Sequence, residues 1–272
     1  MSEYEYWVVE DHKMGIFWLK LNRPNKRNAF NEAVALELGE VLDEFRTNEE
    51  IRILILSSTS DAFFSAGADI DWFAAINGEE AEEISKKSHE IFGKLQELPF
   101  PVIAAIKGVC ITAGLEVILC ADMIYVADNA KLGLIETVFG ITPGGGGTQR
   151  LVRLIGPNRA KEMIFNARII GAEEAERIGL ANAMFPLEGF EEKIDRIARK
   201  MLMNDQGAIS RCKKLINLAT YSNDEGFREE QYSFNTSFAS GEPRSRLTEY
   251  KKQQEREKRR KERKQKKAEI KK

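Results

Sequence analysis

The sequence predicts an α/β protein in which strands and helices alternate first and helices follow. Apolar runs of strand length, such as Ile16–Leu21 and Val102–Ile106, alternate with segments of helical periodicity up to about residue 155. Helical patterns dominate from residue 158 onward. A chain of 272 residues with 43% apolar content can bury the core of one or two domains.

The first strand is expected at Ile16–Leu21, because this run ends at a turn cluster that contains Pro24. The segment 31–47 follows with apolar residues at helical spacing, and Asn31 stands in the position of a helix cap. Ile51–Leu56 is rich in isoleucine and leucine, which predicts a buried strand.

A second helix is expected over residues 79–98, because Pro99 and Pro101 follow it and prolines end helices. The remaining predicted elements are the strand Val102–Ile106, a helical turn at Val117–Cys120, strands at Asp122–Asp128 and Lys131–Leu134, a helix from Thr148, and helices at 158–166, 172–178, 188–203, 208–219 and 223–238. No internal sequence repeat is evident.

Cysteine and histidine usage argues against a disulfide framework, a metal site and a Ser-His-Asp hydrolase. The cysteines are odd in number, and Cys110 and Cys120 lie in apolar runs, which favours buried free thiols. His12 and His89 have no Cys, Asp or His partners at ligand spacing. We therefore expect no metal ion.

The ends of the chain differ in charge. The amino terminus is acidic and has no basic-then-apolar signal, and no run is apolar enough to span a bilayer, so a cytoplasmic protein is expected. Residues 251–272 contain 13 Lys or Arg and four Glu, a balance of +9, whereas the preceding 250 residues carry −11. This basic tail has almost no apolar side chains, which favours a solvated helix or disorder. Contact with a polyanion such as RNA is the alternative.

Two carboxyl groups, Glu116 and Glu136, lie in surroundings that are otherwise poor in acidic residues. Small residues follow predicted strands at Thr112–Glu116 and at Ala62–Ile70. Backbone N–H groups at such turns point outward and can hold developing negative charge. Two turns of this kind predict an oxyanion hole with two donors.

Three sequence blocks resemble the signature blocks of the enoyl-CoA hydratase, or crotonase, family. They are AGADI at 66–70, KGVCITAGLEVILCAD at 107–122 and GLIETVFGITPGGGGTQR at 133–150. The resemblance runs from about Gly15 to about Tyr250, in the order and spacing of the family. It implies a spiral of repeated ββα units over residues 1–195, a helical trimerisation region over 196–250 and the basic tail over 251–272.

The resemblance also implies the site residues. Ala68 and Ala113 would supply the oxyanion-hole N–H groups, Glu136 would exchange the proton at the α-carbon, and Glu116 would hold and activate water. The substrate would be an acyl-CoA thioester, so coenzyme A is part of the substrate and no separate cofactor is expected. The residues expected to bind this substrate are Lys26, Arg27, Ala29, Ala66, Gly67, Asp69, Ile70, Val109, Gly114, Pro143 and Gly144.

The glycine-rich run Gly140–Gly147 is expected to let the backbone pass close to the thioester and bend into the next helix. Phosphate binding is a weaker alternative, because the run lacks the Lys-Ser/Thr of a P-loop. Two departures from the family pattern, Ala113 in place of Gly and Ile135 in place of Pro, would retune the acyl pocket without removing a functional group.

Other interpretations stay open at this stage. Glu116 would otherwise be an acid that stabilises a helix start, Glu136 a surface acid, and Lys26 with Arg27 a solvated pair. Asp69 is more typical of a loop or cap than of a catalyst. Tyr250 and Lys252 lie near positions that contact the ligand in relatives.

The expected function is an enoyl-CoA hydratase that assembles as a homotrimer or a dimer of trimers. Isomerisation or decarboxylation of acyl-CoA is the alternative within the family, although two glutamates favour hydration. An RNA-binding protein that uses the basic tail is the alternative from another class.

Overall fold

The computed structural model describes residues 4–73, 78–219, 252, 255–256 and 259–260. It divides the chain into two compact units, Met1–Lys214 and Leu215–Lys272. The first unit holds all of the strands described below. The described part of the second unit is the end of α9 and short helical pieces near residues 252–260. The predicted helix over 223–238, Tyr250 and most of the basic tail lie outside the described residues.

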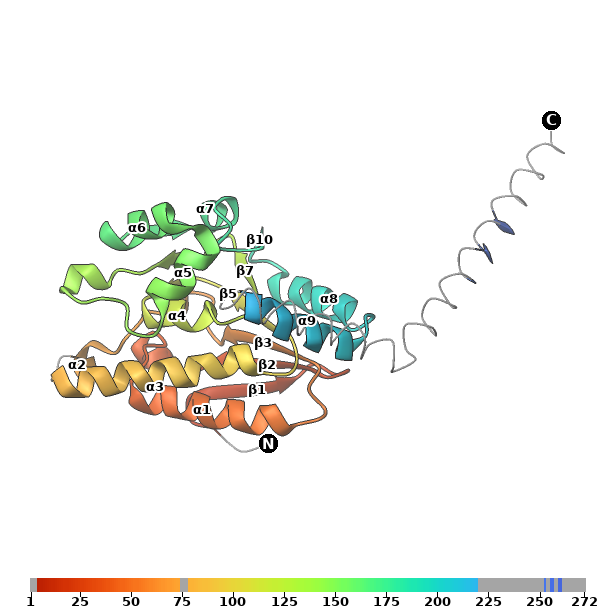
Figure 1. The fold of residues 1–272 in the computed structure, drawn as a ribbon, viewed down its shortest axis with the longest axis horizontal. Helices are drawn as coiled ribbons and strands as arrows, with labels where there is room; N and C mark the ends of the chain where they lie inside the picture. The colour runs from red at the N-terminus through yellow and green to blue at the C-terminus, as the bar shows by residue number, and fades with distance from the viewer. Residues whose placement is uncertain (1–3, 74–77, 220–251, 253–254, 257–258, 261–272) are drawn as a thin grey trace. The chain divides into compact units, whose positions relative to one another are not determined.

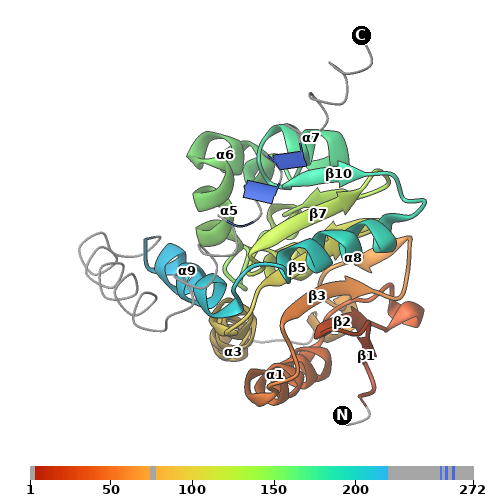
Figure 2. The ribbon, with the colours of Figure 1, turned by 90° about the vertical axis from the view of Figure 1, so that its right-hand side faces the viewer.

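A six-stranded sheet forms the centre of the first unit, with the order β1-β2-β3-β5-β7-β10. Its strands are β1 (Trp7–Asp11), β2 (Ile16–Leu21), β3 (Ile53–Ser58), β5 (Val102–Ile106), β7 (Met123–Ala127) and β10 (Ala183–Phe185). Only the β1–β2 pair of this sheet is antiparallel. Figure 2 shows these strands side by side.

A second sheet has the order β4-β6-β8-β9. Its strands are β4 (Phe63–Ser65), β6 (Val109–Ile111), β8 (Lys131–Gly133) and β9 (Ile169–Gly171). β4, β6 and β8 run parallel, and β9 is antiparallel to β8. The carboxyl ends of three strands therefore meet at one edge of this sheet.

The helices and 3-10 turns lie between and after these strands. They are η1 (Pro24–Lys26), α1 (Glu32–Thr47), α2 (Ile70–Phe73), α3 (Gly78–Glu97), α4 (Ala113–Ile118), η2 (Glu136–Phe139), α5 (Gly147–Ile155), α6 (Pro157–Phe165), α7 (Ala172–Arg177), α8 (Phe190–Met201) and α9 (Gln206–Ala219). Among the described residues, none of these helices is both long enough and apolar enough to cross a membrane.

The chain alternates between the two sheets, which confirms the predicted spiral of ββα units. In the pairs β3–β4, β5–β6 and β7–β8, the first strand joins the six-stranded sheet and the second joins the four-stranded sheet. A helix or 3-10 turn follows each pair. Each turn of the spiral therefore adds one strand to each sheet, although the sequence shows no repeat.

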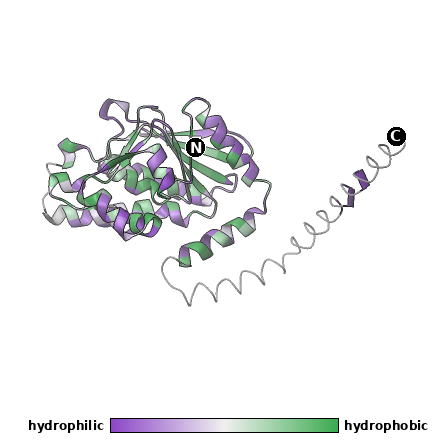
Figure 3. Ribbon diagram, turned by 90° about the horizontal axis from the view of Figure 1, so that it is seen from above, coloured by the Kyte–Doolittle hydropathy of each residue, from purple (hydrophilic) through white to green (hydrophobic). Residues whose placement is uncertain are grey.

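Both faces of the six-stranded sheet are buried. One face packs against α8 through Phe190, Ile194 and Ala198, and the larger core on the other face includes the apolar stripe of α1. In Figure 2, α8 lies across the strands while α1 and α3 lie together. The strands are largely green in Figure 3, and the helices carry both purple and green residues. This distribution is the pattern of helices that cover a buried sheet.

Charged side chains fasten the last helices of the unit to the core. Glu191 of α8 accepts hydrogen bonds from Lys20 at 3.0 Å and from Lys107 at 2.7 Å. Lys213 of α9 donates to Asp122 at 2.9 Å and to the carbonyl oxygens of Leu95 and Phe100. Burial lowers the pKa of Lys213 and raises the pKa of Asp122.

The structure matches most predicted elements and corrects several. β2 and β5 span their predicted residues, and Asn31 caps α1 by accepting a hydrogen bond from Val34 N at 3.0 Å. β3 begins at Ile53 rather than Ile51, and α4 begins at Ala113 rather than Val117. β1 and the three-residue strands β4, β6, β9 and β10 were not predicted. A three-residue strand is too short to show a clear alternation of apolar and polar residues.

Candidate active site

The three sequence blocks meet at the carboxyl edge of the four-stranded sheet. Ser65 of β4 aligns with Cys110 of β6, and Ile111 of β6 aligns with Gly133 of β8. The segments that follow these strands hold Ala66–Ala68, Thr112–Glu116 and Leu134–Glu136. Ligands of parallel sheets bind outside the carboxyl ends of the strands. Strand register therefore brings together the predicted amides and carboxyls.

The two loops with the predicted oxyanion-hole amides pack directly against each other. A Cβ built on Gly67 would lie 1.7 Å from Thr112 Oγ1, and a Cβ on Gly114 would lie 2.7 Å from Ser65 Cβ. Only glycine permits this approach at either position. Ala68 and Ala113 are half-buried, and neither N–H donates to an acceptor among the described residues. Both amides are therefore available to a ligand.

Thr112 adopts an unusual backbone conformation immediately before Ala113. Its φ of 48° and ψ of −126° lie in a region that favours glycine and cost a β-branched residue on the order of 1–3 kcal/mol. Its Oγ1 is buried and has no hydrogen-bond partner among the described residues. A buried hydroxyl without a partner costs a further ~1–3 kcal/mol. The start of α4 thus keeps two destabilising features beside a predicted amide donor.

Glu116 is buried, and its carboxyl group turns toward the glycine-rich run. Its Oε1 accepts hydrogen bonds from Gly145 N at 2.8 Å and Gly147 N at 2.9 Å. Burial raises the pKa of Glu116, while the two N–H groups and the charge of Arg150 act in the opposite direction. This carboxyl is therefore held in one orientation. Glu116 lies in the first turn of α4, as the helix-start interpretation has it, but its side chain is buried.

Glu136 begins η2 and is also buried. Burial raises its pKa from 4.5 to about 7, a hydrogen bond to its own backbone opposes the rise, and the charge of Glu116 adds to it. Its Oε2 has no hydrogen-bond partner within the described part of the chain. The surface-acid interpretation of Glu136 is therefore wrong, and the two carboxyls act on each other electrostatically.

The glycine-rich run has a role that the sequence did not indicate. A Cβ on Gly145 would lie 2.9 Å from Glu116 Oε2, and a Cβ on Gly147 would lie 3.0 Å from Oε1. These glycines allow the backbone to approach a carboxyl group of the protein itself. Pro143 is buried, and the Gly144 carbonyl accepts a hydrogen bond from Ser85 of α3 at 2.6 Å.

Lys26 and Arg27 lie beside the first amide loop. The backbone at Arg27–Phe30 pairs with Ala66–Asp69, with Ala66 N donating to Arg27 O and Phe30 N to Gly67 O. Lys26 is exposed and pairs with Asp71 at 2.8 Å, and the Arg27 guanidinium lies over the Phe63 ring. The structure thus brings both cations to the site edge.

Asp69 is held by a residue that the sequence did not single out. Arg23 donates to Asp69 Oδ2 at 2.8 Å and to the carbonyl of Ala29 at 3.0 Å. The hydrogen bond from Arg23 lowers the pKa of Asp69. Ile70 follows on α2 and is 73% exposed, while Val109 is half-buried on β6. Asp69 therefore joins the amide loop to the segment after β2.

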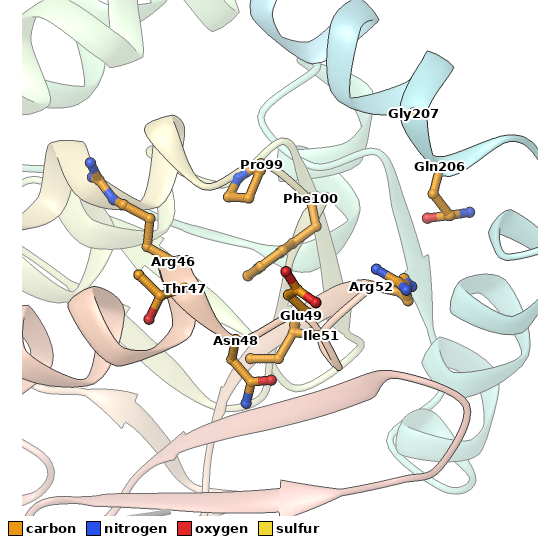
Figure 4. A pocket seen from close by; sticks show the side chains of 10 residues that line it. All are labelled: Arg46, Thr47, Asn48, Glu49, Ile51, Arg52, Pro99, Phe100, Gln206 and Gly207. Atoms are coloured by element: carbon orange, nitrogen blue, oxygen red, sulfur yellow. The ribbon is translucent and has the colours of Figure 1, made fainter. Parts of the chain in front are cut away.

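A separate pocket of about 420 Å³ lies away from these groups (Figure 4). It is lined by Arg46, Thr47, Asn48, Glu49, Ile51, Arg52, Pro99, Phe100, Gln206 and Gly207. None of the predicted site residues lines it, and Arg46 is paired with Glu97 at 2.8 Å. Within the described residues, no group of three His, Cys, Asp or Glu side chains is placed to hold a metal ion.

Several contributors to the site carried no recognisable sequence signal. Contacts with residues distant in the chain involve Arg23, Ser65, Ser85 and Arg150. The only signal in the sequence was that Arg150 ends the third block, a few residues after its glycines. The geometry combines two unengaged amides with two buried carboxyls of different environment, which suits proton transfer beside a carbonyl oxygen that gains negative charge.

Comparison with known proteins shows which family this chain resembles. The sequence model of the enoyl-CoA hydratase/isomerase family matches residues 11–263. A crotonyl-CoA hydratase of Syntrophomonas wolfei is 33% identical over 249 residues, covering 91% of this chain and 95% of that protein. A 2,3-dehydroadipyl-CoA hydratase of Escherichia coli is 32% identical over 209 residues, covering 77% and 81%. The solved enoyl-CoA hydratase of Bacillus anthracis is 34% identical with a TM-score of 0.82, covering 85% of this chain and 90% of that one.

Proposed function

Because the chain belongs to the enoyl-CoA hydratase/isomerase family, we propose that it is a hydratase that adds water across the 2,3 double bond of an enoyl-CoA thioester. The hydratase names of the relatives support this class of reaction. The observation that carries the proposal is a pair of buried carboxyl groups in different surroundings: Glu116 accepts two backbone N–H groups, whereas one oxygen of Glu136 has no partner among the described residues. Hydration needs one group that accepts a proton from water and one that delivers a proton to carbon.

The two carboxyls suit these roles. Burial raises the pKa of Glu116, but two N–H donors and the charge of Arg150 oppose this effect, which suits Glu116 to act as the base. Glu136 has a pKa of about 7 and keeps its proton over much of the neutral range. Two carboxyls whose environments separate their protonation are a recurrent acid/base arrangement. Glu116 would accept the proton of the attacking water, and Glu136 would protonate the α-carbon.

Negative charge develops on the thioester oxygen as the enolate forms. The N–H groups of Ala68 and Ala113 would accept this charge, and each preplaced donor would stabilise the transition state by roughly 3–4 kcal/mol. Their loops are packed by Gly67 against Thr112 and by Gly114 against Ser65, so the donors need little reorganisation. The other residues of the proposed substrate site are Lys26, Arg27, Ala29, Ala66, Asp69, Ile70, Val109, Pro143 and Gly144.

The coenzyme A portion would approach the edge of the site where Lys26 and Arg27 lie. Two neighbouring cations suit a polyanionic ligand. A homotrimer or a dimer of trimers stays a prediction from the family resemblance. The RNA-binding alternative also stays a prediction, since it concerns a tail that lies mainly outside the described residues.

The test follows the absorbance of the conjugated thioester in crotonyl-CoA with wild type, Glu116→Gln and Glu136→Gln. We expect wild type to consume this absorbance and each variant to lose about 10²- to 10⁴-fold in kcat. Undiminished turnover in either variant would remove that residue from the mechanism. Glu40→Gln on the exposed face of α1 controls for the loss of a charge.

The same assay separates the other reactions of the family. An isomerase would generate the conjugated absorbance from a 3-enoyl-CoA without consuming it from crotonyl-CoA, and a decarboxylase would act on neither. Either pattern in the wild-type protein would replace hydration as the proposed reaction.

A further inference from the structure

Arg150 lies on the first turn of α5 and reaches back over the glycine-rich run. Its Nη1 donates to the carbonyl oxygen of Gly145 at 2.8 Å, and its Nε donates to Gln96 Oε1 at 3.3 Å. Gly146 has a φ of 103°, and a Cβ built there would lie 2.0 Å from Arg150 Nη1. Only glycine at 146 therefore leaves room for the guanidinium in this position.

The bond from Arg150 controls the peptide units that hold Glu116. Gly145 donates its N–H to Glu116 Oε1 and accepts the guanidinium at its carbonyl oxygen. The peptide groups on both sides of the Gly145 Cα are thereby held in place. The N–H group of Gly147 donates to the same Glu116 Oε1. Gln96, at the end of α3, ties the guanidinium to a second element.

The guanidinium also acts on Glu116 through its charge. Among the described residues, the titratable groups that face Glu116 are Glu136 on η2, Cys120 just after the end of α4, and Arg150. A negative charge on Glu136 disfavours a second one on Glu116, whereas the positive charge of Arg150 favours it. No contact joins Arg150 to Glu116 directly among the described hydrogen bonds, so the effect acts across the loop.

We propose that Arg150 is a positioning residue for hydration, which holds the glycine-rich loop against Glu116 and places a positive charge behind that carboxyl group without touching the substrate. The inference rests on the proposed function, in which Glu116 accepts a proton from water. Loss of the guanidinium would both loosen the two N–H donors and remove the charge that favours ionised Glu116.

The experiment compares wild type, Arg150→Gln and Arg150→Lys across a pH series of kcat and KM. In Arg150→Gln we expect kcat to fall by about 10- to 100-fold with little change in KM. We also expect the acid limb of the pH profile of kcat to shift to higher pH by about one unit. Arg150→Lys keeps the charge but not the fork of donors. Its acid limb should stay near that of wild type while its kcat falls.

Arg153→Gln is the matched control, because it removes the same charge one turn along α5, where the side chain is exposed and donates to the Gln149 carbonyl. It should retain the wild-type pH profile. An unmoved acid limb in Arg150→Gln would overturn the proposal even if kcat falls, since disturbed packing alone lowers kcat without moving the limb. If Arg150→Gln does not fold, an acid limb raised in Arg150→Lys would overturn the role of the charge.

A second measurement separates this inference from the proposed function. The Glu116 carboxyl can be titrated by ¹³C NMR in substrate-free protein, with its signal assigned from Glu116→Gln. We expect its titration to move to higher pH in Arg150→Gln and to stay in place in Arg153→Gln. An unmoved titration overturns the role of Arg150, whereas a wild-type protein that hydrates no enoyl-CoA overturns the proposed function alone.

Discussion

The raised pKa of Glu136 predicts that Glu136→Gln stabilises the folded protein at neutral and alkaline pH. Burial raises this pKa from 4.5 to about 7, so between these values the folded protein holds a proton that the unfolded chain has released. The stability that comes from this proton is fully present below pH 4.5. It is lost as the pH rises through about 7, because the unfolded chain then binds fewer protons than the folded protein.

The size of the effect follows from the two pKa values. A difference of one pKa unit corresponds to about 1.4 kcal/mol, so the rise from 4.5 to about 7 corresponds to about 3 kcal/mol of unfolding free energy. Glutamine has no proton to release and does not show this loss. Any cost of burying the glutamine amide is independent of pH. Relative to wild type, Glu136→Gln should therefore gain about 3 kcal/mol between pH 4.5 and pH 8.

The assay is urea unfolding of wild type and Glu136→Gln at fixed protein concentration over this pH range. Glu40→Gln, an exposed change on α1, provides the control for an altered net charge. An equal difference between Glu136→Gln and wild type at both ends of the range would refute the reasoning. Glu136 would then ionise as an ordinary carboxyl and would not be a proton donor poised near neutral pH.

Three further outcomes are expected. Lys213→Met should lower the unfolding free energy by about 1–3 kcal/mol, because the carbonyl oxygens of Leu95 and Phe100 and the carboxylate of Asp122 lose their common donor, and adding Asp122→Asn should recover part of this loss in the same unfolding assay. Gly145→Ala should lower kcat by about 10- to 100-fold, because the new Cβ would collide with the Glu116 carboxyl. Gly93→Ala should leave kcat unchanged, because its new Cβ would meet no atom within 4 Å. Equal kcat values for Gly145→Ala and Gly93→Ala would contradict the close approach of Gly145 to Glu116. A thiol reagent should modify only Cys212 in the native protein, since Cys110 and Cys120 are buried. Mass spectrometry would locate the label, and a label on a second cysteine would contradict this prediction.

Two features, the strained backbone of Thr112 and the buried Glu136 oxygen without a partner, indicate that this region is built for a ligand rather than for stability. Both features cost free energy in the folded protein, and Thr112 directly precedes Ala113, one of the two amides of the proposed oxyanion hole. Substitutions that relieve them should stabilise the fold and reduce activity, as is common where a site is under strain.

Local patterns in the sequence were enough for the longer elements. The strands Ile16–Leu21 and Val102–Ile106 were predicted at their observed residues, because each is an almost entirely apolar run, interrupted only by Lys20 in the first, next to turn residues. Asn31 was recognised as a cap for the same local reason. Four of the five three-residue strands were missed, since hydrogen bonds to neighbouring strands, rather than their own side-chain pattern, define them, and the five-residue β1 was missed as well.

The sequence by itself determined the family, most of the longer strands and helices, and the candidate site residues, among them Glu116, Glu136, Ala68 and Ala113. Tertiary structure alone decided that Glu116 accepts hydrogen bonds from the amides of Gly145 and Gly147, 29 and 31 residues away. It also decided that Glu136 is buried where it senses the charge of Glu116, and that Arg150 donates to the carbonyl oxygen of Gly145. The physical reason is that residue type and periodicity are local properties. Burial, hydrogen bonding and pKa depend instead on which distant segments the strand register brings together.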